Sequence, residues 1–280
     1  MRGLEGYPAT MPQIHPTATL GGGVELAADG CIGPQCGLTG PVRVGAGTRL
    51  IGHAYLQGPL EMGDRNTVYP FVCLGFAPQH IRFDPETPGH GLRIGDRNVF
   101  RESVTVHRAF EDEGPTAIGD DNYFMTCSHV GHDVRLGNHV SMNTGAALGG
   151  HVEIEDRVIV GGGSVVHQFV RVGEGAMISG GIGMSQDVLP WFMLTGINVV
   201  GSVNLIGMRR SGMSRDDIDD VRWVYRILCR QGLSVRSAVE RLQERVGRPR
   251  VDAALAFIEG SSKGICTARQ QLTRGSGGAP

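Results

Sequence analysis

The sequence predicts a parallel β-helix followed by a small helical domain. Three observations support this prediction. An aliphatic residue, Met or Phe recurs every six positions over most of the chain, glycine makes up 44 of the 280 residues, and apolar spacing becomes helical beyond Gly196. A six-residue period fits a repeated short strand and turn, in which each repeat buries one large side chain. Three such sides make a triangular coil of about 18 residues, and stacked coils bury the face that each neighbour exposes.

The six-residue period runs through three uninterrupted stretches, at positions 14–74, 94–106 and 118–184. Two segments, residues 76–93 and 108–117, interrupt it, and both are rich in proline, glycine and charge. We expect these segments to be loops that leave the coil. Insertions in solenoids often lie on the functional face, so these loops are candidates for a role in function.

The β-helix is predicted to span residues 12–196, and a helical domain residues 197–273. Ser214 and Ser234 are suitable helix N-caps, each followed by apolar residues at helical spacing, and a third apolar run begins at Val251. This domain would cover the end of the coil, where unpaired strand edges promote aggregation. Residues 274–280 are expected to be a disordered tail.

Composition argues against several classes of protein. The net charge of −2 predicts no nucleic-acid or anionic-membrane surface. The N-terminus lacks the apolar core of a signal peptide, and no apolar run is long enough to span a membrane. Six cysteines without CxxC pairs favour reduced thiols and therefore a cytoplasmic protein. Met11 is an alternative start to Met1.

The segment CSHVGHDVRLGNHV, residues 127–140, concentrates histidines and one carboxylate. Its spacing alone leaves three interpretations open: a metal site, a general base with its orienting carboxylate, or surface residues. Residues one coil apart are vertical neighbours, so His132, His151 and His167 are expected on one wall of the prism. His129 belongs to the same side as His132.

Several motifs carry a family resemblance: IHPTA, IGDRNVFRESVTVHR, SHVGHD, LGGHV, VVHQF and SQDVLPW, in this order and followed by helices. They resemble the bacterial acyl-ACP:UDP-N-acetylglucosamine O-acyltransferases, which catalyse the first step of lipid A synthesis. The resemblance extends from about residue 12 to residue 268. It implies a left-handed β-helix and a homotrimer with active sites between subunits. It also implies acyl carrier protein as the 3-hydroxyacyl donor, UDP-N-acetylglucosamine as the acceptor, and no cofactor or metal.

The same resemblance implies roles for individual residues. His132 is the expected general base for the sugar 3-hydroxyl, Asp133 orients its ring, and the Gly150 amide faces the oxyanion. Met177 and Gly180 match the acyl-chain groove, where glycine favours a longer chain. Other positions match substrate-binding residues of the family: His129, His151, His167, Gln168, Gln79, Arg82, Asn204 and Arg210. The remaining histidines match no site position and are expected to be structural or surface residues: His53, His90, His107 and His139.

Departures from the family pattern cluster in the nucleotide-sugar positions. His80 and Arg82 stand where the family has Asp and Lys, Ile206 replaces an acidic residue, and Ser211 replaces an arginine. Three alternatives therefore stay open beside the main hypothesis. The chain could act on another acceptor such as a 3-amino nucleotide sugar, or be a non-catalytic scaffold. It could also be a metal-dependent hydratase of the γ-carbonic anhydrase type, although the His-x4-His pair of that class is absent.

Overall fold

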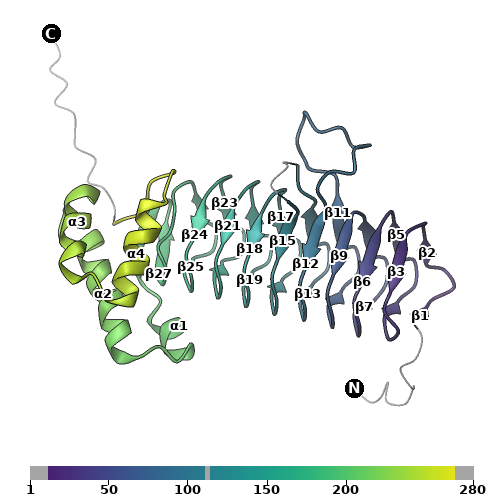
Figure 1. Ribbon diagram of the computed structural model, residues 1–280, viewed down its shortest axis with the longest axis horizontal. Coiled ribbons are helices and arrows are strands. Elements are labelled where there is room, and N and C mark those ends of the chain that lie inside the picture. Colours follow the sequence, from purple (N-terminus) through teal and green to yellow (C-terminus); the bar gives the residue numbers. More distant parts are fainter. Residues whose placement is uncertain (1–11, 111–113, 269–280) are drawn as a thin grey trace, which may run out of the picture.

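The computed structural model describes residues 12–110 and 114–268, and it is a rod with helices at its C-terminal end (Figure 1). Three sheets form the three faces of the rod, and their strands pair in parallel between successive coils. The predicted parallel β-helix is therefore confirmed. The predicted tail, residues 274–280, lies outside the described residues, as do Met11 and residues 269–273.

The first sheet has eleven strands, in this spatial order: β1 (Gln13–Ile14), β4 (Cys31–Ile32), β7 (Arg49–Leu50), β10 (Thr67–Val68), β13 (Val99–Phe100), β16 (Tyr123–Phe124), β19 (Ser141–Met142), β22 (Ile159–Val160), β25 (Met177–Ile178), β27 (Phe192–Gly196) and β28 (Val199–Val203).

The second sheet has nine: β2 (Thr19–Leu20), β5 (Gly37–Thr39), β8 (Tyr55–Gln57), β11 (Cys73–Phe76), β14 (Thr105–His107), β17 (His129–Val130), β20 (Ala147–Leu148), β23 (Val165–Val166) and β26 (Gly183–Met184). The third has eight: β3 (Val24–Leu26), β6 (Val42–Val44), β9 (Leu60–Met62), β12 (Leu92–Ile94), β15 (Thr116–Ile118), β18 (Arg135–Leu136), β21 (Glu153–Ile154) and β24 (Arg171–Val172).

The six-residue positions form the core of the rod. From Ile32 to Met184, each of their side chains is at most 4% exposed. Phe100 and Phe124 stack inside the rod with ring centroids 4.7 Å apart. Ile14 is 43% exposed because it belongs to the first coil, which has no neighbour on one side. One aliphatic side chain per repeat is therefore enough to fill the triangular interior.

A ladder of buried asparagines joins the coils on both sides of the insertions. Asn66 Oδ1 accepts the amide N–H of Asn98 at 2.8 Å, and Asn98 Oδ1 accepts that of Asn122 at 2.9 Å. These partners are 32 and 24 positions apart, whereas Asn122 and Val140 are separated by the regular 18. The ladder therefore keeps the coils in register although extra residues leave the rod twice.

The two predicted insertions overlap the connections between β11 and β12 and between β14 and β15, although the outermost residues of the predicted ranges belong to these strands. The first projects from the rod as a loop (Figure 1). Arg108, only 1% exposed, anchors this loop because its guanidinium donates to the carbonyl oxygens of Pro85 and Thr87 at 3.2 and 2.8 Å. The same group donates to the carbonyl oxygen of Gly75 at 3.1 Å, so it ties the loop to the rod.

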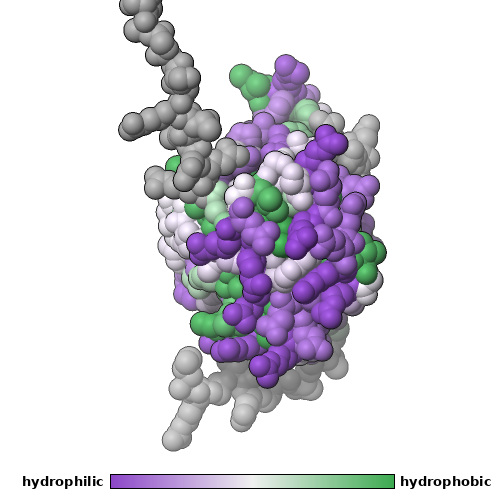
Figure 2. All heavy atoms as spheres, turned by 90° about the vertical axis from the view of Figure 1, so that its left-hand side faces the viewer, coloured by the Kyte–Doolittle hydropathy of each residue, from purple (hydrophilic) through white to green (hydrophobic). Residues whose placement is uncertain are grey.

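The helices are α1 (Leu205–Arg210), α2 (Arg215–Arg230), α3 (Val235–Leu242), the 3-10 turn η1 (Gln243–Arg245) and α4 (Pro249–Glu259). Both predicted N-caps are confirmed, since the side-chain oxygens of Ser214 and Ser234 accept the amides of Asp217 and Ser237. Viewed from the helical end, the surface is mainly polar (Figure 2). That surface suits a cap on the last coil.

β27 and β28 form an antiparallel hairpin that continues the first sheet into the helical region. The domain boundary after residue 196 stays a prediction. None of the helices in the described part of the chain has the length and apolar character needed to cross a membrane.

Candidate active site

His132 lies in the turn between β17 and β18, where the second sheet meets the third. Asp133 follows it with φ of 60°, in the left-handed region that Asp tolerates better than most residues. This conformation lets two adjacent side chains meet, and His132 Nδ1 lies 2.6 Å from Asp133 Oδ2. The carboxylate can only accept, so Nδ1 carries the hydrogen and Nε2 offers its lone pair to the solvent side.

The second insertion holds Asp133 in place. The backbone N–H of Phe110 donates to both carboxylate oxygens, at 3.0 and 3.2 Å, and the Asp133 N–H donates to Thr116 Oγ1 at 2.8 Å. The side chain of Asp133 is 8% exposed. A buried carboxylate fixed by backbone donors stays where it can orient the imidazole and stabilise an imidazolium.

Gly150 lies directly beneath the ring of His132, one coil further along the rod. A Cβ at this position would be 2.7 Å from Cε1 and 2.8 Å from Nε2 of His132, so only glycine fits. Within residues 12–110 and 114–268, the Gly150 amide has no acceptor. A free N–H beside the nitrogen of a general base is the arrangement that stabilises an oxyanion.

Two further histidines flank this pair. His151 donates its amide to the carbonyl of His132, and its Nε2 is 3.8 Å from Asp133 Oδ2. His129 hydrogen-bonds through Nδ1 to Thr105 Oγ1 at 2.8 Å. Burial, with a smaller contribution from nearby His107, lowers the pKa of His129 to about 4. His129 is therefore neutral near pH 7 and suited to hydrogen bonding with an uncharged group.

A hollow of about 380 Å³ opens over the second sheet beside His132. It brings together six of the predicted site residues: Gln79, His129, His132, Gly150, His167 and Gln168. His151 packs edge-on against the His132 ring at 5.2 Å but does not line the hollow. Of the three histidines predicted to share one wall, His132 and His167 line the hollow and His151 packs against the His132 ring outside it.

Two histidines that line the hollow, His80 and His107, were not among the predicted site residues. His80 stacks on Phe110 with ring centroids 4.7 Å apart, and each ring lies 5.9 Å from that of His132. His107 is 8% exposed and bonds the carbonyl of Ala77 through Nδ1 at 2.7 Å, and its Nε2 has no partner among the residues that the structure describes. The sequence could have predicted that His107 lies near His129, because the two are about one coil apart when the residues of the second insertion are left out of the spacing.

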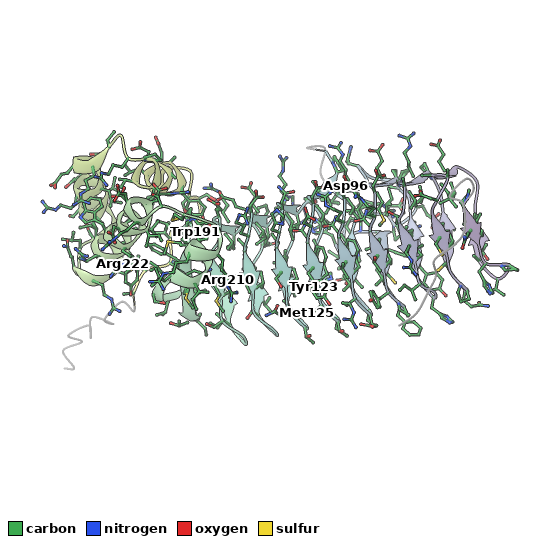
Figure 3. All side chains as sticks on the ribbon, turned by 90° about the horizontal axis from the view of Figure 1, so that it is seen from below. Asp96, Tyr123, Met125, Trp191, Arg210 and Arg222 are labelled. Atoms are coloured by element: carbon green, nitrogen blue, oxygen red, sulfur yellow. The ribbon has the colours of Figure 1, made fainter. Side chains whose placement is uncertain are left out.

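The other predicted site residues lie elsewhere on the chain. Arg82 is exposed on the loop, Met177 is on β25 of the first sheet, and Gly180 is in the turn after it. Asn204 caps α1 and donates to the carbonyl of Gly175 at 2.8 Å. Arg210, at the exposed end of α1, lies on the same side of the rod as Tyr123 of the first sheet (Figure 3). None of these five residues lines the hollow, although the backbone N–H of Arg82 donates to Nδ1 of His80, which does.

Three donor atoms, from His132, Asp133 and His151, lie within 4.8 Å of one another and are the candidate metal ligands in the described part of the chain. Nδ1 of His132 and Oδ2 of Asp133 are too close together to be two ligands of one zinc ion. Two ligands of a tetrahedral zinc ion are roughly 3.3 Å apart, because each bond is about 2.0–2.1 Å long. The 2.6 Å separation of His132 Nδ1 and Asp133 Oδ2 is that of a direct hydrogen bond.

Relatives of this chain match it over most of its length. An acyl-(acyl-carrier-protein)–UDP-N-acetylglucosamine O-acyltransferase of Thermodesulfovibrio yellowstonii is 39% identical, over 91% of this chain and all of the relative. One of the same name from Syntrophobacter fumaroxidans is 42% identical over 90% of this chain and 99% of the relative. The chain belongs to this acyltransferase family. Residues 187–266 also match the family model described as Udp N-acetylglucosamine O-acyltransferase, domain 2.

Solved structures of the O-acyltransferase family have the same fold. The UDP-N-acetylglucosamine acyltransferase of Francisella novicida superimposes with a TM-score of 0.88 at 28% identity, over 92% of this chain and 95% of the other. The UDP-N-acetylglucosamine O-acyltransferase of Moraxella catarrhalis gives 0.85 at 32%, over 90% and 99%. The rod and its helical end therefore superimpose on nearly the whole length of these solved structures.

Proposed function

We propose that this chain transfers a (R)-3-hydroxyacyl group from acyl carrier protein to the 3-hydroxyl of UDP-N-acetylglucosamine, the first step of lipid A biosynthesis. The observation that carries the proposal is the His132–Asp133 pair, with Nδ1 and Oδ2 2.6 Å apart and Gly150 packed against the imidazole. The substrates are inferred from the names of the relatives, and the chemistry is inferred from the His132–Asp133 pair, called the dyad below. We also propose a cytoplasmic location, where reduced thiols are expected.

The reaction follows from the dyad. His132 Nε2 accepts the proton of the sugar hydroxyl as its oxygen attacks the thioester carbonyl carbon. The carbonyl oxygen becomes an oxyanion that accepts the N–H of Gly150. When this intermediate collapses, the carbon–sulfur bond breaks and the thiolate takes the proton from His132. An ester replaces a thioester, and the proton balance needs no cofactor.

The remaining residues divide into two groups. His129, His167, Gln168 and Gln79 surround the hollow and are proposed to bind the sugar and the carrier's pantetheine, with His151 beside them. The others are proposed to bind nucleotide and acyl chain: Arg82, Asn204, Arg210, Met177 and Gly180. Their separation from His132 supports a homotrimer in which neighbouring subunits complete each site. Light scattering of the purified protein tests this assembly, and a monomeric mass would contradict it.

One observation favours a second candidate acceptor. His80 and Phe110 form an aromatic wall beside His132 where the family resemblance predicts a carboxylate. A 3-amino nucleotide sugar differs from the 3-hydroxy form at the reacting atom. The replacement of the expected carboxylate by aromatic rings beside His132 could therefore change which of the two acceptors the site selects. The same dyad would then form an amide in place of an ester.

The test is acyl transfer by the purified chain from 3-hydroxyacyl-ACP to each nucleotide sugar, followed by mass spectrometry of the product. We expect an ester with UDP-N-acetylglucosamine, a loss of at least about 100-fold in His132→Ala, and wild-type activity in the control His139→Ala. His139 is an exposed histidine on the same rod, seven residues from the base. Product with the 3-amino sugar alone would support the second candidate, and no product with either would contradict both.

A further inference from the structure

A column of side chains connects the C-terminal segment to the dyad. Lys263, the single lysine of the chain, places its ammonium 5.0 Å from the ring centroid of Phe169. Phe169 in turn stacks on His151, with centroids 4.5 Å apart and an interplanar angle of 11°. His151 reaches Asp133 through its Nε2 at 3.8 Å. Lys263 and Phe169 do not line the hollow, but they are connected to the His132–Asp133 pair through His151.

Asp187 fixes the segment that carries Lys263. Its carboxylate is fully buried and accepts the Ser261 hydroxyl at 2.7 Å and the backbone N–H of Arg171 at 2.8 Å. Its backbone N–H donates to the carbonyl of Gly264 at 2.8 Å, and its carbonyl accepts the N–H of Cys266 at 2.7 Å. Lys263 therefore stands on a short segment that is clamped on both sides to the last coil.

Phe169 needs such a support. It occupies a turn with φ of 64° and is 44% exposed, so its own coil leaves much of the ring uncovered. Aromatic χ2 torsions are broad, and a half-exposed ring is not held in one orientation by packing alone. A cation over one face and an imidazole on the other select the orientation in which the stack forms.

We propose that Lys263 and Phe169 are positioning residues that hold the imidazole of His151 against Asp133, and so keep the His132–Asp133 pair in its productive geometry. This inference rests on the proposed function. Lys263 acts through Phe169 and makes no contact of its own with substrate. Loss of either residue frees the His151 ring to turn away from the carboxylate, and kcat falls while the KM values for both substrates stay near wild type.

The experiment is a double-mutant cycle on steady-state kinetics. Lys263→Met is expected to lower kcat roughly three-fold, the size of a partly exposed cation–π contact, and Phe169→Leu roughly ten-fold. The double variant should be no worse than Phe169→Leu alone. The conservative variants Lys263→Arg and Phe169→Tyr should restore activity, because each retains the contact. Arg236→Met, which removes an exposed cation on α3, is the matched control.

Three kinetic results would overturn the inference. The first is a wild-type kcat in Lys263→Met, and the second is failure of Lys263→Arg to restore activity. The third is that Lys263→Met lowers kcat by the same factor in the wild type and in the Phe169→Leu variant. The last result, with a raised KM for one substrate, would indicate that Lys263 binds a phosphate directly. An inactive wild type would instead contradict the proposed function.

A second measurement does not depend on activity. With histidines labelled at the ring carbon Cε1, the NMR signal of His151, assigned by its loss in His151→Gln, should shift or broaden in Lys263→Met and Phe169→Leu. Arg236→Met should leave it unchanged. An unaltered His151 signal in both variants would overturn the inference whether or not the enzyme is active.

Discussion

Gly150 and His132 are in contact in a way that only glycine permits. A Cβ at Gly150 would be 2.7 Å from the Cε1 atom of His132, less than real Cβ atoms show. The same glycine presents its amide where the oxyanion is proposed to form. The residue at position 150 therefore affects both the position of the His132 ring and the proposed donor to the oxyanion.

Gly150→Ala is expected to reduce kcat by about 100-fold or more, because the imidazole must move away from both the donor and the substrate hydroxyl. The measurement is kcat together with the melting temperature. Gly22→Ala is the control, since a Cβ at Gly22 meets nothing within 4 Å. Wild-type kcat in Gly150→Ala would show that the ring does not need its present position.

Stability should fall as the pH is lowered through the range in which His129 resists protonation. Its folded pKa is about 4, below the ordinary 6.5, so the unfolded chain takes up a proton first. Above pH 6.5 both states are neutral at His129 and its contribution is complete. Between pH 6.5 and 4 this contribution of His129 is lost, and the free energy of unfolding falls by on the order of 2 kcal/mol.

The measurement is the free energy of unfolding at several pH values for wild type and His129→Gln. The variant should show a shallower loss over that range, because glutamine does not titrate. His53→Gln, which removes an exposed imidazole elsewhere on the same rod, is the matched substitution for comparison. Parallel curves for wild type and His129→Gln would contradict a depressed pKa at this position.

The asparagine ladder should be a major contributor to the stability of the rod. Asn98→Ala leaves the buried amide of Asn122 and the carbonyl of Gly119 without their partners. We expect a loss of about 2–4 kcal/mol in the free energy of unfolding. Asn143→Ala, in a less buried turn, should cost about 1 kcal/mol or less, and equal losses in the two variants would argue against the ladder.

Arg108 should control the order of the first insertion. Arg108→Met removes the donors that hold the carbonyls of Pro85 and Thr87. The loop should then open, and trypsin should cleave after Arg82 at least about ten-fold faster than in wild type. Arg157→Met, which removes an exposed arginine elsewhere on the rod, is the control. An unchanged cleavage rate would show that other contacts hold the loop.

The sequence by itself determined the rod. In a triangular coil each six-residue repeat buries its aliphatic residue in the interior. The local sequence pattern and the global fold therefore agree. The same held for both insertions and for the caps Ser214 and Ser234, which depend on neighbours only a few residues away. The pairing of His132 with Asp133 could also be predicted from the sequence, because the two residues are adjacent in the chain.

The tertiary structure alone decided what surrounds that pair. His80 and Phe110 come from two different insertions, and their meeting beside His132 depends on how each loop folds back. His107 lies 5.3 Å from the His129 ring because Thr105, two residues before it, pairs with His129 across the second insertion. Lys263 reaches Phe169 only through the buried clamp of Asp187. Contacts between distant segments depend on loop closure and packing, which no local period encodes.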